Sequence, residues 1–140
     1  MKKSILVSLL LVPLTACTSS QHEKSFDVKN ADFSKASDIN LCTVYGAGLN
    51  RSLEAKSELI KRSTFTDSEW NNISKHQVTA GMSECAVLAS YSASYKSKKS
   101  NARQVSITYS CNGNHVPYCP YTKVNFVDGK VTSVYALQEK

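Results

Sequence analysis

The sequence predicts an α+β domain in which N-terminal helices pack on a three-stranded antiparallel sheet, with disulfides. Between residues 37 and 91, apolar residues recur every three or four positions, a spacing typical of helices. From Arg103 onward, apolar and polar residues alternate as in half-buried strands. Asp128-Gly129 separates two strand-like runs, and this pair favours a tight hairpin turn. Helices followed by a meander indicate a single two-layer domain over residues 37–140.

The first seventeen residues have the pattern of a secretory signal peptide. Two lysines precede an apolar run from Ser4 to Leu14, which is too short to remain as a membrane-spanning helix. The run leads into Leu14-Thr15-Ala16-Cys17, which resembles the lipobox of bacterial lipoproteins. The resemblance implies that residues 1–16 are removed. It also implies that Cys17 receives a diacylglycerol on its sulfur and an acyl chain, such as palmitate, on its new amine. The alternative is an ordinary secreted protein with a cysteine near its cleavage site.

The lipobox resemblance also implies a location. Thr18 stands where lipoproteins retained in the inner membrane typically carry an aspartate, so we expect the outer membrane, with the protein facing the periplasm. Residues 17–36 are polar and contain only isolated apolar side chains. Such a segment cannot bury enough surface to offset its ordering entropy, so we expect a lipidated flexible tether there.

Each expected helix begins at a residue whose side chain can accept a hydrogen bond from a free backbone N–H. The candidate caps are Ser37 or Asp38, Asn50 or Ser52, Thr66 and Ser83. Gly46 and Gly48 are expected to end the first helix. Strands are expected at 103–110, 121–127 and 130–137, and the serine- and lysine-rich stretch 92–102 is expected to be a loop.

Four cysteines remain after Cys17, and an even number in an oxidising compartment indicates two disulfides. They are Cys42, Cys85, Cys111 and Cys119. Of the three possible pairings we favour Cys42–Cys85 with Cys111–Cys119. A zinc site is the competing interpretation, but it requires close ligand pairs, and the nearest two cysteines have seven residues between them. The sequence contains no C-x-x-C motif, so it gives no indication of a redox-active cysteine pair.

Several short motifs resemble the SmpA/OmlA (BamE-like) superfamily of small outer-membrane lipoproteins. They are Val78–Glu84 with the helix after it, the C-terminal Val-Asn-Phe-x-Asp-Gly-Lys-Val, Leu41-Cys42, and the helical Glu58-Leu59-Ile60-Lys61-Arg62. The resemblance implies helices on one face of a three-stranded sheet that serves protein or lipid contact and not catalysis. Ser92-Ala93-Ser94 departs from the usual Gly-x-Pro, and the basic loop and the Cys111–Cys119 segment are additional. No binding surface can therefore be carried over from that superfamily.

The charge of the chain favours an anionic partner. The formal charge is +6, and it falls to +4 when Lys2 and Lys3 leave with the signal. This mild excess favours anionic lipid headgroups or an acidic protein and is no signature of nucleic-acid binding. The candidate binding residues are Lys96, Lys98, Lys99, Arg103 and the neighbouring Tyr118. The alternative is a basic loop that is only solvated.

No catalytic motif is recognisable, so we expect a protein that is not an enzyme and that has no cofactor, metal or small-molecule substrate. The three histidines are isolated in sequence, and no serine stands in a nucleophile motif. The first functional hypothesis is an anchored interaction or assembly module. The alternative is an inhibitor of an envelope-active enzyme, of the lysozyme- or β-lactamase-inhibitor type, that uses the Cys111–Cys119 loop.

Overall fold

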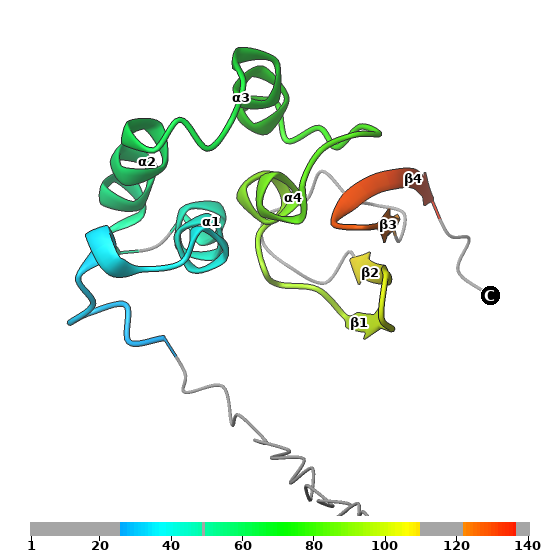
Figure 1. Ribbon diagram of the computed structural model, residues 1–140, viewed down its shortest axis with the longest axis horizontal. Coiled ribbons are helices and arrows are strands. Elements are labelled where there is room, and N and C mark those ends of the chain that lie inside the picture. The colour runs from blue at the N-terminus through cyan, green and yellow to red at the C-terminus, as the bar shows by residue number, and fades with distance from the viewer. Residues whose placement is uncertain (1–25, 49, 110–121, 137–140) are drawn as a thin grey trace, which may run out of the picture.

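The computed structural model describes residues 26–48, 50–109 and 122–136. Within these ranges, helices lie on one side of a four-stranded antiparallel sheet (Figure 1). The helical elements are η1 (Phe33–Lys35, a 3₁₀ turn), α1 (Asp38–Ala47), α2 (Ser52–Lys61), α3 (Asp67–Ser74) and α4 (Glu84–Tyr91). The strands are β1 (Ser97–Ser100), β2 (Gln104–Tyr109), β3 (Thr122–Val127) and β4 (Lys130–Ala136), paired in sequence order. In Figure 1, α4 lies between α1 and the sheet, and α2 lies at the opposite end of the molecule from the sheet.

The α+β class is confirmed, but the prediction of three strands is wrong. β1, which was expected to be part of a basic loop, pairs with β2 so that Lys99 lies opposite Ser106. Serine and lysine do not favour strands in general. β1 is an edge strand, however, and lysines suit an edge because they discourage pairing with other chains. Asn101 closes this hairpin, since its backbone N–H and side-chain oxygen both bond to the backbone of Gln104.

Three of the four helices begin at their expected caps. The hydroxyls of Ser37 and Ser83 accept hydrogen bonds from the backbone N–H three residues further on. Thr66 and Glu69 form the reciprocal capping box at the start of α3. The exception is α2, whose cap position is Arg51 in left-handed backbone conformation; its side chain donates to the Glu54 carboxylate at 2.8 and 2.6 Å and makes no hydrogen bond that caps the helix backbone.

The tight turn between β3 and β4 is the one that the sequence predicts. Asp128 and Gly129 have φ of 49° and 74°, as a type I′ turn requires. The Asp128 N–H also donates to the Arg103 carbonyl oxygen at 2.9 Å. This bond joins the β3–β4 turn to the β1–β2 hairpin, so the ends of both hairpins are held together.

A disulfide and a close backbone approach join α1 to α4. Cys42 and Cys85 are bonded, with Cα atoms 5.4 Å apart, which confirms one of the two favoured pairings. Closing a chain separation of 43 residues contributes about 4 kcal/mol to stability on the chain-entropy model. Cys111 and Cys119 lie outside the described residues.

Side chains from both layers complete one buried core, including Leu41, Leu59, Val87, Ile107, Tyr109, Val124 and Phe126.

Residues 26–36 pack against the domain, although the sequence predicted a flexible tether that extends through residue 36. Phe33 is 3% exposed, and Phe26 and Val28 contact the core. Arg51 donates to the carbonyl oxygens of Val28 and Ala31 at 2.7 and 2.9 Å, and its guanidinium lies 4.0 Å from the centre of the Phe33 ring. The packed part of the chain therefore includes residues 26–36, before the expected start of the domain at Ser37.

Arg62, which follows α2, holds the next part of the same segment. It donates to the carbonyl oxygens of Phe33 and Ala36 at 2.9 and 2.8 Å. The carboxylates of Asp38 and Glu58 hold the guanidinium in place at 2.8 and 2.9 Å. Both arginines reach more than twenty residues back along the chain, so the composition of the segment alone does not reveal its order.

Gly46 lies inside α1, and the prediction that it ends the helix is wrong. A Cβ there would lie 1.9 Å from the Leu88 carbonyl oxygen of α4. We predict that Gly46→Ala destabilises the protein by about 3 kcal/mol, because backbone atoms held next to a disulfide cannot move aside.

The matched control is Gly48→Ala. Gly48 ends α1 with φ of 64°, and nothing lies within 4 Å of a Cβ built there. Alanine is disfavoured in the left-handed backbone conformation, so we expect Gly48→Ala to lower the free energy of unfolding by only about 1 kcal/mol. Urea unfolding measures both variants, and equal losses would contradict the close approach of α1 and α4.

Candidate functional site

The face of the sheet that points away from the helices is polar and uncovered by any described element (Figure 1). Alternate residues of β2 and β3, such as Ile107 and Val124, are buried on the helix side. The intervening residues form two rows across the strands. One row is Ser97, Thr108, Lys123 and Tyr135; the other is Lys99, Ser106, Asn125 and Ser133. We call these eight residues the outer face.

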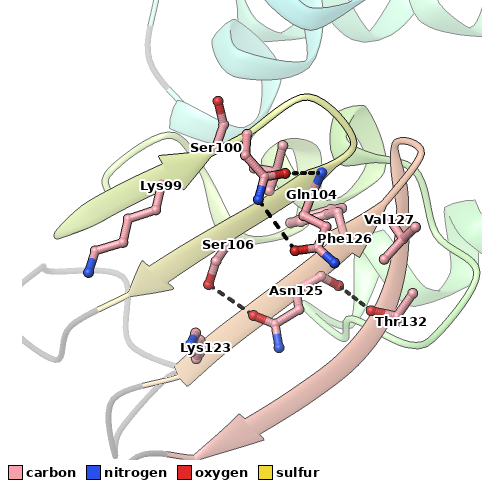
Figure 2. Close-up of a pocket in the computed structure, with 11 residues that line it drawn as sticks. Lys99, Ser100, Gln104, Ser106, Lys123, Asn125, Phe126, Val127 and Thr132 are labelled. Atoms are coloured by element: carbon pink, nitrogen blue, oxygen red, sulfur yellow. Dashed lines mark hydrogen bonds between the residues drawn. The ribbon is translucent and has the colours of Figure 1, made fainter.

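A shallow trough of about 450 Å³ runs across the outer face. Lys99 on β1 and Lys123 on β3 line it, with Ser106 on β2 between them (Figure 2). A second hollow of about 250 Å³ adjoins it and shares these three residues. Ammonium groups next to hydroxyls are donors without a compensating negative charge, so the trough suits carboxylate or phosphate oxygens.

Hydrogen bonds fix the central side chains of the outer face. Asn125 accepts from the Ser106 hydroxyl at 2.9 Å and donates to Ser133 at 3.0 Å and to the Tyr135 hydroxyl at 2.5 Å. The Thr132 hydroxyl donates to the Asn125 backbone carbonyl at 3.2 Å (Figure 2). Because an amide is no base, the bond from Ser106 orients its hydroxyl without activating it as a nucleophile. The arrangement suits binding by fixed polar groups.

The outer face carries positive charge only. None of the described residues of the four strands is acidic. The acidic side chain nearest in sequence to β3 and β4 is Asp128 in their turn, and it is paired with Arg103, whose Nε and Nη2 donate to its two carboxylate oxygens at 2.8 and 2.5 Å. Lys99 and Lys123 are therefore the charged side chains that an anion meets in the trough.

The structure separates the predicted binding residues. Lys99 lies on the outer face, as a binding role requires. Lys98 lies opposite the buried Ile107 on the helix side, where it pairs with Glu84 at the start of α4 at 2.5 Å. Arg103 lies at the hairpin end in its pair with Asp128. The backbone N–H of Lys96 donates to the Thr108 carbonyl at 2.8 Å just before β1. Tyr118 lies outside the described residues.

Lys123 and Asn125 were missed as site residues. The signal was present in the sequence, since alternation in Thr122–Val127 places them on the same face as Ser106 and Thr108 once the strand register is known. Lys98 and Lys99 are adjacent in sequence and look like one cluster of charge. Because neighbouring residues of a strand point to opposite faces, only one of the two can lie on the outer face.

In the described ranges, no group of three or more His, Cys, Asp and Glu is placed to hold a metal ion. None of the helices in those ranges is long and apolar enough to cross a bilayer.

Comparison of the chain with protein-family models, with curated proteins and with solved structures finds no match. The resemblance to the SmpA/OmlA superfamily therefore stays a prediction.

The Arg103–Asp128 pair gives a testable pH dependence. The hydrogen bonds from Arg103 lower the pKa of the Asp128 carboxyl below its usual value. A carboxyl with a lowered folded pKa contributes stability above its unfolded pKa of about 3.9, and the contribution is lost as the pH falls through the folded pKa. We predict that Asp128→Asn is less stable than the unmodified protein at neutral pH and that the difference shrinks below about pH 4.

Urea unfolding across this pH range measures the difference. Asparagine tolerates the left-handed backbone of this turn position, so the substitution isolates the charge. A gap in stability that stays constant from neutral to acid pH would contradict the pairing.

Proposed function

We propose that this chain is a non-catalytic interaction or assembly module, held on the periplasmic side of the outer membrane by lipid on Cys17. Its outer face binds an acidic surface of another envelope protein. The observation that carries the proposal is the trough between Lys99 and Lys123, on an uncovered sheet face whose described residues include no acidic side chain. The N-terminal sequence pattern supports the anchor.

Two features favour a binding surface over a catalytic one. The hydroxyl of Ser106 donates to an amide, and the described residues that line the trough include no histidine or carboxylate. The outer face is also broad and shallow and not an enclosed cleft, which fits a protein surface better than a small substrate. The inhibitor alternative relies on the Cys111–Cys119 loop, which lies outside the described residues, so the trough supports the interaction module.

We predict that Lys99→Glu combined with Lys123→Glu abolishes partner binding, because both substitutions reverse the charge that faces the partner. The matched control is Lys29→Glu with Lys75→Glu, two exposed lysines away from the sheet. The readout is photo-crosslinking in intact cells from a photoreactive residue at position 108. Thr108 is partly exposed on the outer face.

We expect a discrete protein adduct with the Lys29→Glu, Lys75→Glu control variant. With the Lys99→Glu, Lys123→Glu variant, the intensity of this adduct should fall at least about tenfold. A surface ion-pair interface should also weaken at high salt in the solubilised complex. Adducts to lipid alone, or a protein adduct that is insensitive to the charge reversal, would contradict the proposal.

A further inference from the structure

Helix α2 exposes an apolar stripe on the side that faces away from the domain. Leu53 and Ile60 are 76% and 54% exposed, whereas Ala55 and Leu59 on the opposite side of the helix are fully buried against the core. Residues seven apart fall on the same side of a helix. Leu53 and Ile60, with Ser57 between them, therefore form one continuous strip, which we call the α2 stripe.

Lysines border the α2 stripe on both sides. At about 100° of rotation per residue, Lys56 falls on one flank and Lys61 on the other. The Lys61 side chain is 74% exposed, and its ammonium lies 3.6 Å from the largely buried carboxylate of Glu58. Lys56 lies with its ammonium 5.7 and 5.8 Å from the ring centres of Tyr45 and Trp70. Apolar side chains between cationic flanks are typical of a helix that lies in the surface of an anionic membrane.

The first residues that the structure describes lie at the same end of the molecule as α2. Phe26 is the first described residue, and its ring centre lies 6.1 Å from that of Phe33, over which Arg51 of the α2 start is stacked. From Cys17 to Phe26 the chain has nine residues to span, which limits the separation to about 30 Å even when fully extended. In Figure 1 the coloured chain that starts at residue 26 and α2 lie on the same side of the molecule, away from the sheet.

We propose that the α2 stripe docks on the surface of the membrane that carries the lipid anchor. Leu53 and Ile60 enter the headgroup boundary, and the flanking lysines contact the phosphates of anionic lipids. The outer face of the sheet, at the opposite end of the molecule, is then directed away from the bilayer. This inference rests on the proposed lipidation of Cys17, because the short connection is what brings α2 to the membrane.

The test uses the natively lipidated full chain in vesicles of phosphatidylethanolamine and phosphatidylglycerol, with and without brominated acyl chains that quench tryptophan. The single native tryptophan is removed by Trp70→Phe. In this background, Leu53→Trp places the probe on the α2 stripe and Val127→Trp places it on the outer side of the sheet. We expect roughly twofold lower fluorescence of the Leu53→Trp protein in brominated vesicles, and no change for the Val127→Trp protein.

The outcomes separate this inference from the proposed function. If both proteins sediment with the vesicles but are quenched equally, the anchor stands and docking through α2 is overturned. If neither sediments, the lipid anchor itself is contradicted and the docking falls with it. A Leu53→Cys variant tests for a second copy of the chain. If this variant forms disulfide-linked dimers and the Leu53→Trp protein is not quenched, the stripe contacts a second copy and membrane docking is overturned.

A second measurement needs no substitution in the domain and therefore does not depend on the folding of the tryptophan variants. Acetylation by a water-soluble reagent, read by mass spectrometry, compares the vesicle-bound protein with the unlipidated Cys17→Ser protein in solution. Lys61 should lose reactivity several-fold on the vesicle, while Lys99 should keep it. Unchanged reactivity of Lys61 in sedimented protein would overturn the proposal.

Discussion

Two arginines, one at each end of α2, determine where the N-terminal segment leaves the domain. Arg51 and Arg62 donate to backbone carbonyls between Val28 and Ala36. A guanidinium suits this role because its planar, rigid fork serves several acceptors at once, which a lysine does not. Glu58 and Asp38 hold Arg62 in turn and raise its pKa. The segment is thereby fixed to α2, and its first described residue, Phe26, lies only nine positions after Cys17 in the sequence.

This attachment gives the molecule two distinct ends. At one end, α2 and the N-terminal segment lie together, and at the other the sheet exposes its polar face (Figure 1). Between them, the Cys42–Cys85 disulfide and the close contact at Gly46 lock α1 to α4. The Lys98–Glu84 pair then fixes the edge strand β1 to α4. Two ends that differ in this way fit the proposed module, which is anchored at one end and presents the other to a partner.

Local signals in the sequence predicted much of the fold, and non-local contacts account for what it missed. Caps at Ser37, Thr66 and Ser83 and the Asp128-Gly129 turn are decided by neighbouring residues, so they are readable from a short window. β1 was missed because its lysines and serines do not favour a strand by themselves. It is a strand only because it pairs with β2. Of the two lysines that line the trough of the candidate site, the sequence analysis named Lys99, whereas Lys123 becomes its neighbour only through the register of three strands. The order of residues 26–36 was missed because the arginines that hold it lie far along the chain.

Hydrogen exchange of the Ala31 and Ala36 amides tests the arginine attachment most directly. These amides donate to the carbonyls of Asp27 and Phe33, so they report on the segment that the arginines hold. The attachment predicts protection in the native protein and at least about tenfold faster exchange in the Arg51→Lys, Arg62→Lys variant, where charge is kept and the fork is lost. An Arg103→Lys control should leave both amides protected. Exchange at the rate of an unstructured peptide in the native protein would contradict the attachment, and with it the placement of residues 26–36 beside α2 on which the proposed membrane docking relies.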